Sequence, residues 1–163
     1  MKSLLVLRHA KSSWKETDQV DHDRPLNKRG KHDAPRIGKL LRQERLIPEL
    51  VLSSSARRAR DTAEAAIEAS GYTPEIRHLP SFYQCDLGAF YDTLRLLPGD
   101  LDRVMIVGHN PELEQLVYAL TAETVVLPTA ALVHISLPLQ AWSDLDTNTR
   151  GALVKTWLLE HAD

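Results

Sequence analysis

The chain has 163 residues, of which 43% are hydrophobic and 26% charged, a composition that fits one globular domain over residues 1–163. No apolar run approaches the roughly 20 residues that span a bilayer, so a membrane protein is not expected. The net charge of −2 argues against general nucleic-acid binding, although residues 1–60 hold 15 of the 20 Lys and Arg residues and 7 of the 22 Asp and Glu residues. This basic part of the chain would attract an anionic substrate; the alternative is an ordinary solvated basic surface.

The first predicted element is a buried strand from Leu4 to Leu7, which ends at Arg8 and His9. Apolar strands without polar alternation are typical of sheets that helices cover on both faces. In such α/β sheets, ligands bind beyond the carboxyl ends of the strands, which makes Arg8 and His9 candidates for a site. The alternative is that the strand simply ends in polar residues.

A loop is predicted over residues 10–25, followed by a helix from Asn27 to about Arg45 in which Pro35 should introduce a kink. Within the loop, Asp21-His22-Asp23 resembles a metal-ligand cluster. Three consecutive residues do not easily converge on one ion, and no second pair follows at ligand spacing, so no metal site is expected.

A second apolar run, Leu50 to Leu52, leads into serines that could cap a helix reaching about Ser70, with Gly71 as its stop. Arg57 and Arg58 fall in the first turn, where the helix dipole disfavours cations. Their position favours an anion site built from guanidinium and free amides. The alternative is that the arginines extend into solvent or pair with nearby acids.

The second half of the chain continues the alternation of strands and helices. The predicted elements are a strand at 75–79, a helix at 86–97, a strand at 104–107 ending in Gly108 and His109, a helix from Pro111 to Leu120, a strand near 131–135 and a strand or short helix at 152–159. The pattern predicts an α/β fold, a three-layer sandwich with a mostly parallel central sheet flanked by helices. The lone Cys85 permits no intrachain disulfide, which is typical of the cytoplasm, and four apolar residues before Arg8 are too few for a secretory signal.

Arg8, His9, Arg58 and His109 all lie where a strand leads into a helix or loop. Acyl transfer would need a hydroxyl or thiol nucleophile beside a base, and this set lacks one. Two guanidiniums and two imidazoles suit phosphoryl transfer, which requires charge neutralisation around three oxygens and here needs no metal or other cofactor.

Three segments in this order carry a family resemblance: Arg8-His9-Ala10, Ser54-x-x-x-Arg58-Ala59-x-x-Thr62-Ala63 and Gly108-His109-Asn110-Pro111. They resemble the motifs of the histidine phosphatase superfamily, which has the phosphoglycerate-mutase-like fold. The stretches Arg8-His9-Ala10-Lys11-Ser12-Ser13-Trp14 and Asp23-Arg24-Pro25-Leu26 are similar to its SixA branch of small phosphohistidine phosphatases.

The resemblance implies that His9 is the nucleophile and becomes a phosphohistidine, while Arg8, Arg58 and His109 bind the phosphoryl oxygens. Arg58 is preferred to Arg57 because it keeps the four-residue step to Thr62. His9 must attack through a neutral nitrogen, so its other ring nitrogen should donate to a carbonyl or carboxylate.

Two departures from the superfamily pattern stand out. Ala10 replaces a common glycine, and no carboxylic acid is evident to protonate a leaving oxygen. Asp86 is the candidate acid, although capping the following helix is an alternative role. Lys11, Ser12 and Trp14 are candidates for substrate contact, and Trp14 could instead pack over the loop.

The missing acid favours a substrate with a nitrogen–phosphorus bond, most simply phosphohistidine on a signalling or phosphotransfer protein. Three alternatives remain: a phosphatase or mutase acting on small phosphomonoesters, a phosphate-binding module without turnover, and a nucleic-acid binder using the basic part of the chain. The last lacks the aromatic residues and motifs of such proteins.

Overall fold

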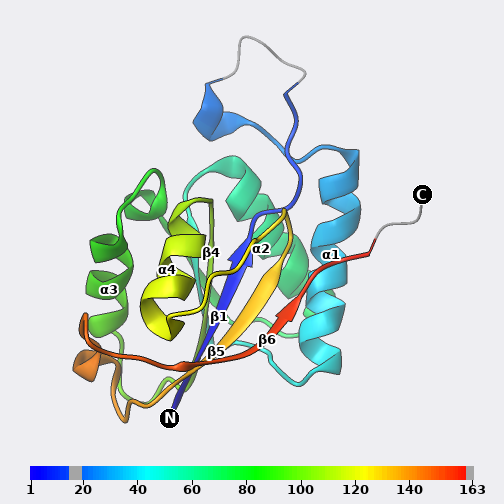
Figure 1. Ribbon diagram of the computed structural model, residues 1–163. Coiled ribbons are helices and arrows are strands. Elements are labelled where there is room, and N and C mark those ends of the chain that lie inside the picture. The colour runs from blue at the N-terminus through cyan, green and yellow to red at the C-terminus, as the bar shows by residue number, and fades with distance from the viewer. Residues whose placement is uncertain (15–19, 161–163) are drawn as a thin grey trace.

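A six-stranded sheet forms the centre of the computed structural model, which describes residues 1–14 and 20–160 (Figure 1). Its strands are β1 (Lys2–Arg8), β2 (Leu50–Ser54), β3 (Glu75–Leu79), β4 (Arg103–Gly108), β5 (Leu132–Leu137) and β6 (Ala152–Trp157). The order across the sheet is β3-β2-β4-β1-β5-β6. The first four strands in this order are parallel, and β5 runs antiparallel to both of its neighbours. The predicted mostly parallel sheet is therefore confirmed.

Two pairs of helices cover the two faces of the sheet, which gives the predicted three layers. Helices α1 (Lys28–Gln43) and α2 (Arg57–Ser70) lie on one face, and α3 (Leu87–Arg95) and α4 (Glu112–Thr121) lie on the other (Figure 1). Alternate residues of β1 enter the two cores, because successive side chains of a strand point to opposite faces. Leu4 and Val6 pack with α3 and α4, whereas Leu5 and Leu7 pack with α1 and α2.

Pro35 does not interrupt α1, which runs as one helix from Lys28 to Gln43. Proline removes one backbone hydrogen bond, but the buried face of α1 packs closely on α2 and outweighs this loss. The closeness shows at Gly38, where an added Cβ would lie 1.9 Å from the carbonyl oxygen of Ala66.

Helix boundaries differ from the predictions by one or two residues. The N-cap of α2 is Ala56, which makes no side-chain cap, and the hydroxyl of Ser54 instead accepts a hydrogen bond from the Ala56 N–H. Pro111 is the N-cap of α4 rather than its first residue. Gly71 ends α2 in the left-handed conformation, with φ of 80°, as predicted.

The remaining predicted elements match the structure in type. Residues 75–79 form the edge strand β3, and 152–157 form the strand β6 rather than a helix. Within the loop at 10–25, residues 15–19 lie outside the described part, and Ser12 forms an isolated bridge with Leu26. No helix among the described residues is both long and apolar enough to cross a bilayer.

The sheet topology brings three strand ends together. β1 pairs with β4 in a register that places Arg8 opposite Gly108, so His9 and His109 follow at the same edge. β2 lies on the other side of β4, and its parallel direction places Ser54 and the start of α2 at that edge too. The carboxyl ends of β1, β2 and β4 therefore frame one site.

Candidate active site

A polar pocket of about 220 Å³ lies at these strand ends. Its lining residues are Arg8, His9, Lys11, Ser12, Trp14, Arg24, Arg58, His109, Asn110 and Thr129. The fold thus brings together all four residues that the sequence placed at strand ends. It also places at this pocket the three candidates for substrate contact in the loop after β1, which are Lys11, Ser12 and Trp14. Among the described lining residues there is no Asp or Glu.

His9 is held as a neutral imidazole with a defined tautomer. Its side chain is buried, and Nδ1 lies 2.7 Å from the carbonyl oxygen of Ala10. A carbonyl oxygen only accepts hydrogen bonds, so Nδ1 carries the proton and Nε2 keeps its lone pair. Burial, opposed by this hydrogen bond and reinforced by His109 and the arginines, lowers the pKa of His9 to about 3.

His109 faces His9, with 5.1 Å between the ring centroids. Its Nε2 lies 2.8 Å from the hydroxyl of Ser54, which already accepts from the Ala56 N–H. We assign the hydrogen of the Ser54 hydroxyl to Nε2, because this hydroxyl has no other acceptor in the described structure; the imidazole proton is then on Nδ1, a buried nitrogen without a hydrogen-bond partner there. Burial and then the charge of Arg58 lower the pKa of His109 to about 4.

Arg8 is directed by the main chain of a distant segment. Its Nη1 donates to the carbonyl oxygen of Leu127 at 2.9 Å, whereas its buried Nε has no partner among the described residues. Burial lowers the pKa of Arg8, and the charge of Glu114 opposes this effect. A guanidinium with unpaired N–H groups that lines a polar pocket can bind an anion.

Arg58 and Arg57 occupy different environments, as their positions one residue apart on α2 require. Arg58 is 6% exposed and lines the pocket, whereas Arg57 is exposed and approaches Asp61 at 3.5 Å. One helical turn after Arg58, the Thr62 hydroxyl accepts from the Ala10 N–H at 3.0 Å. This contact ties α2 to the backbone beside His9, which gives the four-residue spacing a structural reason.

Sequence reasoning missed the group of side chains that surrounds Arg58. Asp21 accepts from Arg58 Nη2 at 3.1 Å, from Arg24 Nε at 3.0 Å and from the Tyr83 hydroxyl at 2.5 Å. Burial alone would raise the pKa of Asp21, but these hydrogen bonds and the charge of Arg58 lower it to about 2. Asp21 is thus an ionised partner of the arginines.

Arg24 connects this group to the loop after β1. It donates to the Ser12 hydroxyl at 2.8 Å, and its guanidinium lies 3.4 Å from the centre of the Trp14 ring. Trp14 therefore stacks on an arginine while remaining 72% exposed at the pocket rim. The three-residue step from Asp21 to Arg24 was a visible signal, whereas nothing in the irregular segment around Tyr83 pointed to this site.

Asp86 does not line the pocket. Its carboxylate accepts from the Ala89 N–H at 3.3 Å and caps α3, which is the alternative role considered for it. The adjacent Cys85 is half-buried, and burial together with Glu112 raises the pKa of its thiol to about 11. Within residues 1–14 and 20–160, no three His, Cys, Asp or Glu side chains are grouped to hold a metal.

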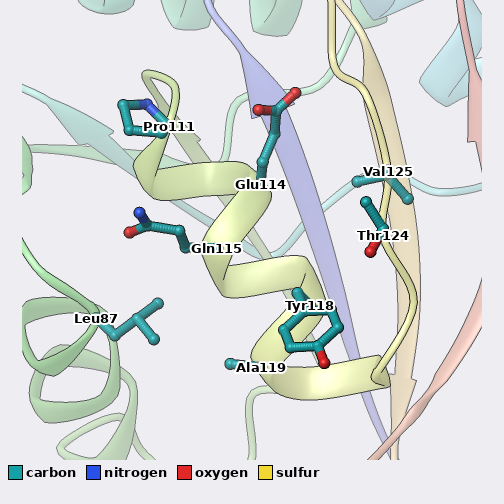
Figure 2. A pocket seen from close by; sticks show the side chains of 8 residues that line it. All are labelled: Leu87, Pro111, Glu114, Gln115, Tyr118, Ala119, Thr124 and Val125. Carbon is teal, nitrogen blue, oxygen red and sulfur yellow. The ribbon is translucent and has the colours of Figure 1, made fainter.

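A larger and mostly apolar pocket of about 500 Å³ lies between α3, α4 and residues 124–125 (Figure 2). Its lining residues are Leu87, Pro111, Glu114, Gln115, Tyr118, Ala119, Thr124 and Val125. Pro111 follows Asn110 of the polar pocket, so the two pockets flank one turn. The smaller pocket contains both imidazoles, the buried Arg24 and Arg58 and the half-buried Arg8, and it is the candidate active site.

The low pKa values of His9 and His109 predict a loss of stability in mild acid. An unfolded histidine has a pKa near 6.5, so below this pH the unfolded chain binds protons that the folded protein excludes. The free energy of unfolding should then fall with decreasing pH, with a limiting slope of about 1.4 kcal/mol per pH unit for each histidine. Urea unfolding at several pH values between 7 and 5 gives the free energy of unfolding at each pH. This free energy should change less steeply with pH for His109→Asn than for the wild type. Equal slopes would contradict burial of His109 in its neutral form.

Comparison with known proteins supports the family relationship that the motifs indicated. The model of the histidine phosphatase superfamily (branch 1) matches residues 4–97, a range that includes Arg8, His9 and Arg58. The crystal structure of a proposed phosphohistidine phosphatase SixA from Agrobacterium tumefaciens has a TM-score of 0.83 and 27% identity, and the match covers 97% of this chain and 98% of that one.

Two curated relatives extend the comparison. An uncharacterized chloroplastic protein of Arabidopsis thaliana is 33% identical over 142 residues, which are 80% of this chain and 65% of the relative. A 2,3-bisphosphoglycerate-dependent phosphoglycerate mutase of Bifidobacterium longum is 39% identical over 69 residues, 41% of this chain and 28% of the mutase. The chain thus matches less than two thirds of the length of either relative. Because the family model covers more than half of the chain, this protein belongs to the histidine phosphatase superfamily.

Proposed function

We propose that this protein is a phosphatase that acts through a phosphohistidine intermediate on His9 and removes phosphate from phosphohistidine on another protein. The observation that carries the proposal is the state of His9, which is neutral, has its proton on Nδ1 and presents Nε2 in a pocket with Arg8 and Arg58. A neutral imidazole beside two guanidiniums combines a nucleophile with a binding site for its anionic target.

The proposed reaction has two displacement steps. In the first, the free ring nitrogen of the substrate imidazole takes a proton from solvent, and the lone pair of His9 Nε2 attacks phosphorus. The bond from phosphorus to the substrate nitrogen breaks, and its electron pair stays on that nitrogen, so a neutral imidazole leaves. In the second, water attacks the phosphorus on His9, the new bond breaks, inorganic phosphate leaves and the proton of the water passes to solvent.

The residues around His9 have roles that follow from their contacts. Arg8 and Arg58 neutralise the phosphoryl oxygens, because guanidiniums donate two directed hydrogen bonds and keep their charge. The Nδ1–H of His109 donates to a third oxygen, which a neutral imidazole can do. These roles need no metal ion, and the reaction needs no cofactor.

The carboxylates of the described structure support a nitrogen–phosphorus substrate. Asp86 caps α3 outside the pocket, and Asp21 is ionised in its contact with Arg58. Without a proton donor, an alkoxide leaving group loses the factor of about 10²–10⁴ that general acid catalysis supplies. A phosphorylated imidazole becomes a good leaving group once solvent protonates it.

A phosphorylated signalling or phosphotransfer protein is the substrate class that fits this chemistry. The exposed Lys11 and Trp14 at the pocket rim would contact such a protein around its phosphohistidine. The single cysteine is consistent with a cytoplasmic location.

Initial rates on a phosphohistidine peptide and on a panel of phosphomonoesters test the substrate class. With chelator present, we expect kcat/KM for the peptide to exceed that for every ester by about 100-fold or more, the contribution of a general acid. A faster reaction with an ester, including a phosphoglycerate, would favour the small-molecule phosphatase or mutase and would require an acid, with Asp86 tested first. Phosphate binding without any turnover would favour the binding module.

A further inference from the structure

We propose that Glu114 is a positioning residue for Arg8 and acts through the main chain of Leu127. This inference rests on the proposed function, in which the Arg8 guanidinium binds the phosphoryl group. Glu114 lies on α4 and does not line the polar pocket, so its effect on the site would be indirect.

Two hydrogen bonds on opposite sides of one residue connect Glu114 to Arg8. Glu114 Oε2 accepts from the Leu127 N–H at 2.7 Å, and the Leu127 carbonyl oxygen accepts from Arg8 Nη1 at 2.9 Å. The Leu127 side chain is buried in the core shared with α3 and α4. The carboxylate, the core and the guanidinium therefore fix the same residue at three points.

Asn110 strengthens this arrangement from the start of α4. Its Nδ2 donates to the Leu127 carbonyl at 2.8 Å, beside the hydrogen bond from Arg8. Asn110 lies in the turn just before α4 and Glu114 lies in the first turn of that helix, so one short segment contacts both polar groups of the Leu127 backbone. The Leu127 carbonyl that orients Arg8 and the Leu127 amide are thus held by the same short segment, residues 110–114.

The segment that carries Leu127 has no regular structure to fix it. Residues 122–131 join α4 to β5 without forming a helix or strand, and Ala122 and Ala130 adopt positive φ angles of 60° and 64°. Such a segment depends on individual contacts for its position. Of these, the bond from Glu114 is charge-assisted and lies next to the carbonyl that Arg8 uses.

Arg8 itself depends on that carbonyl. Its backbone is fixed because its N–H donates to Ala131 and its carbonyl accepts from Ala130. Its side chain has one hydrogen bond in the described structure, the bond to Leu127, while Nε is unpartnered. The negative charge of Glu114 also favours the charged guanidinium. The orientation of Arg8 therefore follows the position of Leu127.

The view of the apolar pocket shows how Glu114 can act separately from the other lining residues. Its carboxylate points toward the end of α4 at which Pro111 lies, away from Tyr118 and Ala119 (Figure 2). Gln115 is the next residue on the helix and lines the same pocket. No hydrogen bond joins the Gln115 side chain to Leu127 in the described structure, so Gln115→Ala is a matched control.

A double-mutant cycle measured by binding of inorganic phosphate tests the inference, because binding needs the arginines but no turnover. We expect Glu114→Ala to weaken phosphate binding about 10-fold in the wild-type background, the range of one hydrogen bond to a charged group. In the Arg8→Ala background the same change should weaken binding less than about 2-fold, since Glu114 then has no guanidinium to position. Glu114→Gln should restore binding to within about 3-fold of the wild type, because its amide oxygen can accept from the Leu127 N–H.

The controls separate this role from general stability and from the proposed function. Gln115→Ala should leave phosphate binding within about 2-fold of the wild type, and melting temperatures should be recorded for every variant. Equal losses of binding for Glu114→Ala with and without Arg8, or no loss at all, would overturn the inference. Normal phosphate binding and a normal cycle without turnover of any substrate would overturn the proposed function alone. A wild type that does not bind phosphate would overturn both.

Discussion

Replacement of His9 by alanine should lower kcat/KM on a phosphohistidine peptide by about 10⁴-fold or more, the scale of loss seen when a nucleophile is removed. The His9 imidazole supplies the nitrogen that bonds to phosphorus. Among the described lining residues, no other imidazole has its tautomer fixed by a hydrogen bond to a carbonyl oxygen. Steady-state rates with a chelator present are the measurement. Phosphate binding should remain, because Arg8 and Arg58 are unchanged.

A histidine outside the pocket provides the control for this change. His78 lies near the carboxyl end of the edge strand β3, approaches Glu64 at 3.5 Å and does not line the polar pocket. His78→Ala should keep the wild-type rate within about 2-fold. If His9→Ala retained more than a few per cent of the rate, His9 would not be the nucleophile.

The neighbouring arginines of α2 should respond very differently to the same substitution. Arg58→Ala should lower kcat/KM by about 10²–10³-fold, the loss that follows removal of one preorganised donor to a transition-state oxygen. Arg57→Ala should change it by less than about 3-fold, because Arg57 is exposed and its ion pair with Asp61 is of the surface kind. The measurement is the ratio of the two losses under identical conditions.

Two further variants identify the reason for the loss at Arg58. Arg58→Lys keeps the charge but cannot donate from two nitrogens in one plane, so it should recover only part of the rate. Asp21→Asn should keep more activity than Arg58→Ala, since Asp21 holds the guanidinium without reaching the substrate. Similar losses for Arg57→Ala and Arg58→Ala would show that the choice between them is wrong.

The strands that end at the site residues could be predicted because the sequence pattern of each strand is local. Leu4 to Leu7 and Val104 to Val107 are apolar without alternation, and each run ends at a residue that the fold places at the sheet edge. Parallel strands of one sheet share that edge. Arg8, His9 and His109 could therefore be grouped before any contact was known, and the step from Arg58 to Thr62 selected one of two adjacent arginines.

The parts that could not be predicted depend on contacts between distant segments. Tyr83 reaches Asp21 across 62 residues, and no periodicity in its segment indicates its direction. The Arg8 side chain is oriented by its hydrogen bond to the Leu127 carbonyl. Every residue has a main-chain carbonyl, so the sequence does not indicate which one a side chain will contact. Pro35 shows the opposite case, because this proline is a local signal for an interruption, yet α1 continues through it and packs on α2.

Trapping of a phosphoenzyme tests the central claim, that His9 takes up the phosphoryl group. The protein would be mixed rapidly with phosphohistidine peptide labelled with radioactive phosphorus, denatured and digested. We expect label that is stable in base and lost in acid, as a nitrogen–phosphorus bond requires, on the peptide that contains His9, and no label on the His9→Ala protein. Label on another residue, or full turnover by a protein that is never labelled, would contradict the account.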